Sequence, residues 1–299
     1  MYKKIFIFKL LNLVIHLTNC YLVYKLANKK FAVIYGLNPF VLIEFIGNVH
    51  NDIIVVFFVL LAIFFLKNKK LVLSIISLAL ATGIKYFTIL LLPFIILYYF
   101  RSEKNIGKRL VNCIKFGLLF VMFFILEYFL YIKDFQIFSA MLVQTERYAK
   151  SIYTVLLQIN LDFMLIIKYS LQIIFFACYC KICIDLLVKK HIKFYKIMKE
   201  YNLVLILFLL ILTNCQQWYL IWLFATLMWQ KPNMIRNIIG LTLITEIANT
   251  VYMFNSERYI YDIYYIGTII CLFAIWKIIS NRNLNNRLLD FFRRNSWIN

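Results

Sequence analysis

Residues 71–100 read LVLSIISLALATGIKYFTILLLPFIILYYF, two apolar runs separated only by the polar break around Lys85. Basic residues at 67–70 and 101–104 flank this stretch on both sides. Because Lys and Arg concentrate in the cytoplasmic loops of membrane proteins, both outer ends are expected in the cytoplasm. A helix of about 14 residues rises about 21 Å, which is less than the ~30 Å of a hydrocarbon core. The stretch therefore predicts a short hairpin whose apex stops at or below the outer interface.

The composition of the whole chain places this hairpin in a membrane protein. Of the 299 residues, 64% are hydrophobic and 15% are charged, and the mean hydropathy is +0.82. A soluble domain is about 45–50% apolar and about 25% charged, so this excess of apolar surface would aggregate in water. The composition excludes a soluble enzyme, a secreted disulfide scaffold and a disordered chain.

Polar breaks divide the chain into eleven apolar runs. Four of them, 5–27, 110–132, 163–187 and 259–280, reach the about 20 residues that a full crossing needs. The pattern predicts an all-α fold, a polytopic transmembrane helical bundle of about 9–11 membrane segments that include two short hairpins. The full set of runs is 5–27, 31–46, 52–66, 71–84, 86–100, 110–132, 163–187, 201–214, 217–230, 236–254 and 259–280.

The second short hairpin joins the runs 201–214 and 217–230 through Asn214-Cys215-Gln216-Gln217-Trp218-Tyr219. Irregular polar backbone at membrane depth is tolerated only where it lines a cavity in the protein. Since both short hairpins have their apices on the same predicted side, the sequence predicts one recessed cavity that faces outward.

The net charge of +20 comes from 33 basic and 13 acidic residues. The basic residues lie in clusters between apolar runs, which is typical of cytoplasmic loops and lipid headgroup contacts rather than of nucleic-acid binding.

All of these basic clusters can be cytoplasmic at once, which leaves 47–51, 133–162 and 255–262 outside. The chain is therefore predicted to be a multi-pass cell-membrane protein with an extracytoplasmic active face and a cytoplasmic C-terminus. The same topology puts the N-terminus outside despite Lys3 and Lys4, so we expect that upstream helices are missing from a truncated or split chain.

Lys85 is the first candidate for a functional residue. A charge within an apolar hairpin is costly unless it is paired or hydrated. One interpretation is a lysine that snorkels to the outer headgroups. The other, which we favour, is a cation that binds a phosphate or pyrophosphate at the membrane surface, on a bend built by Gly83 and Pro93.

The second candidate site is Gly47-Asn48-Val49-His50-Asn51-Asp52, at the outer end of the apolar run 52–66. Asp52 or Asn51 is well placed to cap the helix that begins there. Capping does not explain four neighbouring polar groups, whereas His50 and Asp52 together can carry acid–base chemistry or bind a divalent cation. No cofactor is certain from the sequence, and a divalent cation is left open.

The third candidate site combines the amides of Gln216 and Gln217 with the rings of Trp218 and Tyr219, a set that suits a sugar. An interfacial aromatic belt would explain the rings but not the amides. The outer segment around Arg147 is amphipathic enough to lie on the membrane surface. The intramembrane acid Glu246 has two equal interpretations, a site residue or a partner of a neighbouring helix.

Three of the seven cysteines, Cys178, Cys180 and Cys183, have a spacing that resembles a metal site. They lie within an apolar run, and no second pair of ligands or nearby histidine completes a site. We interpret them as small hydrophobic side chains.

Three motifs together resemble the GT-C class of polyprenyl-phosphate-sugar-dependent glycosyltransferases, and in particular bacterial mannosyltransferase-like proteins. Asn38-Pro39 and Glu44, followed by the 47–52 motif, are similar to the pattern NP…E…GN.HND of that family. The stretch 79–93 resembles its G.A…KY…LLP helix pair, and 217–222 resembles its PWYLLW hairpin, with glutamine in place of proline. The motifs occur in the usual order inside a matching hydropathy pattern from about residue 5 to 260.

The resemblance implies a membrane glycosyltransferase that moves a mannose-like hexose from a polyprenyl-phosphate donor to a glycan or lipid acceptor on the extracytoplasmic face. It implies that Lys85, with Tyr86 beside it, holds the carrier phosphate, assisted by Arg147 or Arg258. The best candidate for the base that deprotonates the acceptor hydroxyl is Asp52, with His50 nearby. Asn51, Gln216, Gln217, Trp218 and Tyr219 complete the expected substrate contacts.

The chain departs from the class in one respect, since the large acidic outer loop after the first helix is missing. Residues 1–280 are therefore expected to form a GT-C-like transmembrane domain without its first helices and catalytic outer loop, followed by a basic cytoplasmic tail at 281–299. Two alternatives stay open: a multi-spanning transporter or lipid flippase that uses the same cavity, and an inactive fragment of a split glycosyltransferase gene. Reading the DNA just upstream would separate them most cheaply.

Overall fold

The computed structural model describes residues 2–129, 151, 153, 156–157, 160–189, 192–227, 240 and 242. These residues form helices and connecting loops with no β-strand among them, which confirms the all-α, polytopic membrane fold. The elements, in chain order, are α1 (Tyr2–Leu26), α2 (Lys29–Gly36), α3 (Pro39–Val41), the π-helix η1 (Leu42–Gly47), α4 (Asp52–Lys67), α5 (Leu71–Ile84), the 3-10 helix η2 (Tyr86–Leu91), α6 (Leu92–Tyr99), α7 (Ile106–Phe129), α10 (Leu161–Val188), α11 (Phe194–Ile211), the 3-10 helix η3 (Gln217–Leu220) and α12 (Ile221–Leu227).

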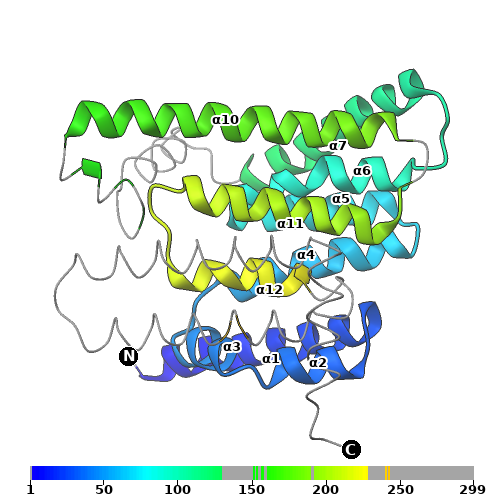
Figure 1. Cartoon of the computed structure of the whole chain (residues 1–299). Coiled ribbons are helices and arrows are strands. Elements are labelled where there is room, and N and C mark those ends of the chain that lie inside the picture. The colour runs from blue at the N-terminus through cyan, green and yellow to red at the C-terminus, as the bar shows by residue number, and fades with distance from the viewer. Residues whose placement is uncertain are drawn as a thin grey trace, which may run out of the picture.

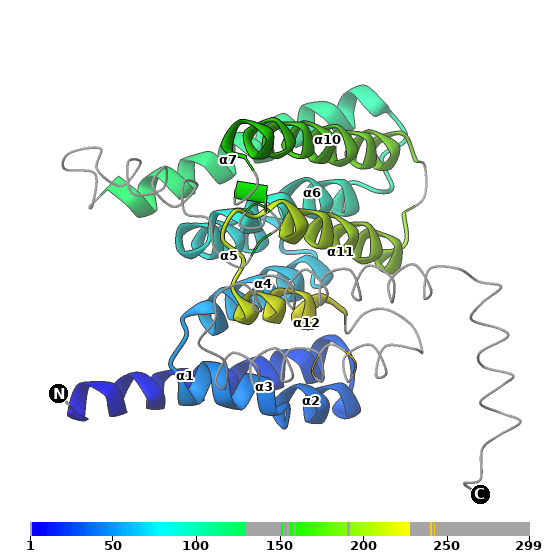
Figure 2. The same ribbon diagram turned by 60° about the vertical axis from the view of Figure 1, so that its left-hand side comes forward.

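The helices lie roughly parallel to one another in layers, and chain direction alternates between most successive helices, whereas α2 and α3 continue as one bent pair (Figures 1 and 2). α7 and α10 form one outer layer, α1 to α3 form the opposite one, and α4, α5, α6, α11 and α12 lie between them. α5 packs against α4 and α7, and α1 packs against α4 and α2. The buried core runs through this middle layer and includes Leu60, Phe94 and Phe224.

Within the described ranges, three helices are long and apolar enough to cross a membrane: Ile5–Leu26, Ile106–Phe129 and Leu161–Val188. They coincide with three of the four full-length runs in the sequence, and the fourth, 259–280, lies outside the described residues. The pair Lys29–Gly36 and Pro39–Gly47 passes the same test as one span with a bend of 51°. The bend falls at Asn38-Pro39, where proline cannot continue the helical hydrogen bonding. The total of nine to eleven segments stays a prediction.

The outer layer of α7 and α10 shows why the chain needs lipid around it. Only 6% of the apolar window of each helix is buried inside the protein. Side chains such as Leu118, Ile173 and Phe176 are instead largely exposed. An apolar surface on this scale is stable only in a hydrocarbon environment.

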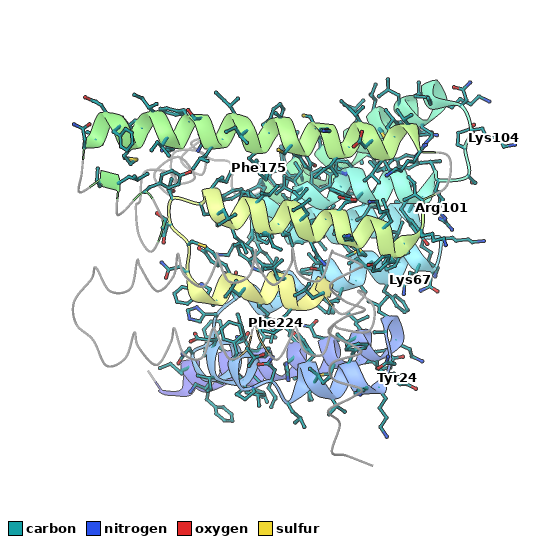
Figure 3. The ribbon with its side chains drawn as sticks, in the orientation of Figure 1. Tyr24, Lys67, Arg101, Lys104, Phe175 and Phe224 are labelled. Atoms are coloured by element: carbon teal, nitrogen blue, oxygen red, sulfur yellow. The ribbon has the colours of Figure 1, made fainter. Side chains whose placement is uncertain are left out.

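The basic residues that follow α4 and α6 gather at one end of the bundle. Figure 3 shows Lys67, Arg101 and Lys104 at the same end. Because successive helices run in opposite directions, the turns at 48–51, 84–86 and 212–216 lie at the other end (Figure 1). The basic tail predicted at 281–299 lies outside the described residues, and the division of the chain into domains stays a prediction.

Candidate active site

Two of the turns at the non-basic end line one cavity, with a volume of about 510 Å³. We call it the apex cavity. The break between α5 and η2 and the loop between α11 and η3 supply most of its wall, and α7, α11 and α12 close it. The sequence predicted one cavity between the apices of the two short hairpins, and both apices line it. Its lining includes Lys85, Tyr86, Tyr128, Asn214, Tyr219 and Trp222.

Lys85 is the one charged residue among the described residues that line the apex cavity. α5 ends at Ile84, and the Lys85 backbone is extended, with φ −143° and ψ 107°. Its Nζ lies 3.8 Å from Asp52 Oδ1 and 4.9 Å from the centroid of the Tyr219 ring. The side chain thus lies against Asp52 and Tyr219 with 24% of its surface exposed, rather than extending away from the protein.

Asp52 is the first residue of α4, and Asn51 occupies the N-cap position without a capping side-chain hydrogen bond. The Asp52 residue is 1% exposed, and its Oδ1 accepts a hydrogen bond from Trp222 Nε1 at 3.0 Å. The carboxylate therefore joins α4 to α12 and to the α5–η2 break. Helix capping, the alternative interpretation of Asn51 and Asp52, does not account for the contacts of Asp52 with Trp222 and Lys85.

An aromatic stack fixes the indole that binds Asp52. The Trp222 ring lies between Phe87 and Tyr219, with centroid distances of 3.5 and 4.4 Å and interplanar angles of 21° and 16°. Trp222 is 5% exposed, so it packs inside the protein rather than in an interfacial belt. The stack and the hydrogen bond together hold the Asp52 carboxylate opposite Lys85.

His50 lies beside this pair in the loop before α4. Its ring stacks on Trp218 with a centroid distance of 4.0 Å and an interplanar angle of 18°. Its Nε2 is 3.3 Å from Glu44 Oε2, which also accepts a hydrogen bond from Asn48 Nδ2 at 3.3 Å. The His50 side chain is 27% exposed, whereas that of Glu44 is 3% exposed.

The remaining predicted contacts divide into described and undescribed residues. Tyr86 lines the apex cavity and is 45% exposed. Gln216 Nε2 donates a hydrogen bond to Asn214 Oδ1 at 2.7 Å within the same loop. Arg147, Glu246 and Arg258 lie outside the described residues, and for Gln217, the first residue of η3, the structure describes only the backbone.

A polar row on α1, which the sequence motifs did not indicate, joins this helix to its neighbours, and one of its members binds the loop that carries His50. Asn12, His16 and Asn19 are all buried. Asn12 Nδ2 donates hydrogen bonds to the carbonyl oxygens of Phe45 at 2.7 Å and His50 at 3.3 Å. The available signal was the spacing i, i+4, i+7, which puts three polar groups on one face of an otherwise apolar helix.

The end of α7 also contributes to the site without having been predicted to do so. Tyr128 Oη donates a hydrogen bond to the carbonyl oxygen of Gly83 at 2.5 Å. The Glu127 carboxylate lies so close to Gly83 that a Cβ at that position would overlap it. The signal in the sequence was a single acidic residue near the end of the apolar run 110–132.

No set of metal ligands is found in the part of the chain that the structure describes. That part contains no group of three or more His, Cys, Asp or Glu side chains that could hold a metal ion. Cys178, Cys180 and Cys183 are free thiols, partly buried along α10. The divalent cation that the sequence left open has no ligand set among these residues.

The comparison with known families concerns the N-terminal part of the chain. The N-terminal third of the chain is related to the mannosyltransferase-like proteins of the GT-C class, as the sequence motifs indicated. Residues 1–101 match the model of the MptA_B family, described as Alpha-(1->6)-mannopyranosyltransferase, N-terminal domain. The matched region contains Glu44, His50, Asp52 and Lys85, and the family indicates mannosyltransferase activity. No curated protein and no solved structure matches the chain.

Proposed function

We propose that the chain transfers a mannose-like hexose from a polyprenyl-phosphate donor to a glycan or lipid acceptor on the extracytoplasmic face of the membrane. The observation that carries this proposal is the Lys85 ammonium group, the one charge on the described wall of an otherwise aromatic and polar cavity. The relationship of residues 1–101 to mannopyranosyltransferases supports the hexose.

Lys85 is proposed to bind the phosphate of the donor. A preorganised cation stabilises the negative charge that develops on a leaving phosphate, and it does so best in a site from which water is largely excluded. Asp52, held by Trp222, keeps the ammonium group at the cavity wall in the absence of a donor. When the donor binds, its phosphate shares the Lys85 ammonium group with Asp52.

The transfer itself needs a base. The acceptor hydroxyl oxygen attacks the anomeric carbon while the bond between that carbon and the phosphate oxygen breaks. The hydroxyl proton passes to the base, and the polyprenyl phosphate leaves with its negative charge opposite Lys85. The sequence favoured Asp52 as the base, but its carboxylate is buried and bound by Trp222. The more exposed His50 suits the base role better, and Asp52 is then the residue that positions Lys85.

Rings and amides around the cavity suit the sugar. Tyr86, Tyr219 and the amide of Asn214 line the apex cavity, and Gln216 is bonded to Asn214. Gln217, Arg147 and Arg258 are proposed as further substrate contacts on the strength of the sequence alone. The outer location is supported by the position of the cavity at the end of the bundle opposite Lys67, Arg101 and Lys104, since basic loops are cytoplasmic.

The proposal is tested by transfer of radiolabelled mannose from a polyprenyl-phosphate mannose in membranes that contain the protein. Lys85→Gln is expected to lower the transfer rate about 100-fold or more, because removing one group that stabilises transition-state charge costs about 10²–10³-fold. Lys85→Arg keeps the charge and should retain part of the activity. Lys104→Gln, at the opposite end of the bundle, is the matched control and should transfer at the wild-type rate.

Two results would overturn the proposal. One is equal transfer by the wild type and Lys85→Gln. The other is movement of a solute or lipid across the membrane without any transfer of sugar, which would identify a transporter or flippase.

A further inference from the structure

A buried glutamate faces the exposed edge of the candidate site. Glu44 is 2% exposed and lies in the π-helix η1, a rare element that is frequent at functional sites. Its carboxylate touches His50 and Asn48 and does not line the apex cavity. Burying a carboxylate is costly unless it has partners, and His50 is one of the groups that the Glu44 carboxylate contacts.

We propose that Glu44 is a positioning residue that fixes the tautomer and the orientation of the His50 ring. This inference rests on the base role proposed for His50. The pair would hold a proton on His50 Nε2, facing Glu44, and leave the lone pair of Nδ1 to accept the proton of the acceptor hydroxyl.

The local backbone explains how Glu44 reaches His50. In η1 the Asn48 amide donates to the carbonyl oxygen of Ile43, five residues earlier, at 2.9 Å. The His50 amide then donates to the carbonyl oxygen of Glu44 at 3.3 Å. These two bonds fold the 48–50 loop back over the wide turn, so the imidazole comes to lie against the carboxylate.

The chemistry of imidazole supplies the next step. A neutral histidine carries a proton on one ring nitrogen and a lone pair on the other, and the hydrogen bond to one nitrogen decides which. Glu44 Oε2 lies 3.3 Å from His50 Nε2, and a carboxylate oxygen favours a proton rather than a lone pair on the nitrogen that it faces. The second nearby carboxylate, Asp52, is engaged with Trp222 and Lys85 and is therefore less able to serve this purpose.

Two further residues hold the imidazole and the backbone of His50. Trp218 stacks against one face of the imidazole, and Asn12 on α1 binds the carbonyl oxygen of His50. Residues that orient a reacting group through a hydrogen bond typically change activity about 10–100-fold when they are replaced. A role of this size is what we expect for Glu44.

Nitrogen-15 magnetic resonance measures the tautomer of His50 directly. The chain has three histidines, His16, His50 and His191, so ring nitrogen-15 spectra of the full chain in lipid bilayers are simple to assign with a His50→Gln variant. We expect neutral His50 to carry its proton on Nε2 in the wild type. Glu44→Gln should keep that tautomer, since an amide oxygen still accepts the bond, whereas Glu44→Leu should give a mixture of both. Wild-type His50 protonated on Nδ1, or an unchanged tautomer in folded Glu44→Leu, would overturn the inference.

Activity gives an independent readout. Glu44→Leu should lower kcat at least about 10-fold with KM within about twofold of the wild type, and Glu44→Gln should recover part of the loss. Glu103→Gln, in the exposed loop after α6, is the matched control and should leave both constants unchanged. Equal losses in Glu44→Leu and Glu44→Gln, or a loss confined to KM, would contradict positioning. If the wild type transfers no mannose, the proposed function fails, while the spectra still decide whether Glu44 sets the tautomer of His50.

Discussion

At the scale of single residues, the site depends on charges that cannot be buried alone. Asp52 begins α4 and Lys85 lies in the break after α5, and each compensates the charge of the other where the Asp52 carboxylate is buried. Trp222 adds the hydrogen bond that an isolated carboxylate would lack. Lys85, Asp52 and His50 could be singled out from the sequence because a charged or titratable group beside an apolar run is conspicuous. The contact between Trp222 and Asp52 could not be predicted from the sequence, because 170 residues separate the two.

The mutual dependence of Asp52 and Lys85 gives a prediction on stability. Asp52→Asn and Lys85→Gln should each lower the free energy of unfolding by about 1–3 kcal/mol, because each leaves a poorly hydrated charge without its partner. The double variant should lose less than the sum of the two, with a coupling of about 1 kcal/mol. Unfolding of the purified protein by a denaturing detergent measures all three values.

A matched pair at the surface provides the control for that cycle. Lys196 and Glu200 form an ion pair one turn apart on α11, with the Lys196 side chain 40% exposed. Their coupling should be about 0.5 kcal/mol or less, because water screens an exposed pair. Equal coupling in the two pairs would show that burial does not strengthen the contact between Asp52 and Lys85.

At the scale of the elements, the helix breaks shape the site. α5 was predicted with both of its ends, because the basic cluster before it and the polar break after it are visible in the sequence. The bend at Asn38-Pro39 follows from proline. The π-helix η1 has no comparable signal, since its hydrogen bonds are decided by what packs around it. Contacts between elements were also invisible, such as Arg109 of α7, whose guanidinium binds the last carbonyls of α10 at Leu186 and Lys189.

Gly83 gives a prediction at this scale. A Cβ at residue 83 would overlap the Glu127 carboxylate, so Gly83→Ala requires the end of the Glu127 side chain to move aside. Because this side chain is flexible, the loss in the free energy of unfolding should be small, about 1 kcal/mol. The double variant Gly83→Ala with Glu127→Ala should regain most of that loss, because the obstructing side chain is gone. Gly117→Ala, in the interior of α7 with open space around it, should instead raise the free energy of unfolding by about 0.5–1 kcal/mol. A loss in Gly83→Ala that Glu127→Ala does not relieve would assign the effect to the backbone instead.

At the scale of the whole molecule, the antiparallel order of the helices separates two chemically different ends. The basic side chains labelled in Figure 3 lie at one end, and the apex cavity lies at the other. This separation is what the alternation of basic clusters and apolar runs predicted. The orientation of the two ends across the membrane stays a prediction of the positive-inside rule.

Thiol labelling in intact cells tests that orientation. In a variant whose seven native cysteines are replaced by serine, Lys104→Cys and Asp162→Cys place one thiol at each end of the bundle. Residue 162 should react with a membrane-impermeant maleimide in intact cells, and residue 104 only after the cells are permeabilised. The reverse pattern would put the apex cavity on the cytoplasmic side and remove the basis for transfer on the outer face.

The sequence by itself determined that the protein lies in a membrane, the class of its fold and the limits of its principal helices, and it proposed Lys85, His50 and Asp52 as candidate site residues. These follow from local properties, namely hydropathy over one helix length, the position of charge between runs, and a lone polar group beside an apolar one. Only the tertiary structure decided that Trp222 binds Asp52, that Glu44 faces His50, and that Glu127 and Tyr128 cover Gly83. Most of these contacts join elements far apart in the chain, and the contact between Glu44 and His50 depends on an unusual turn. Packing and backbone geometry therefore decide the partners, which the order of residues does not record.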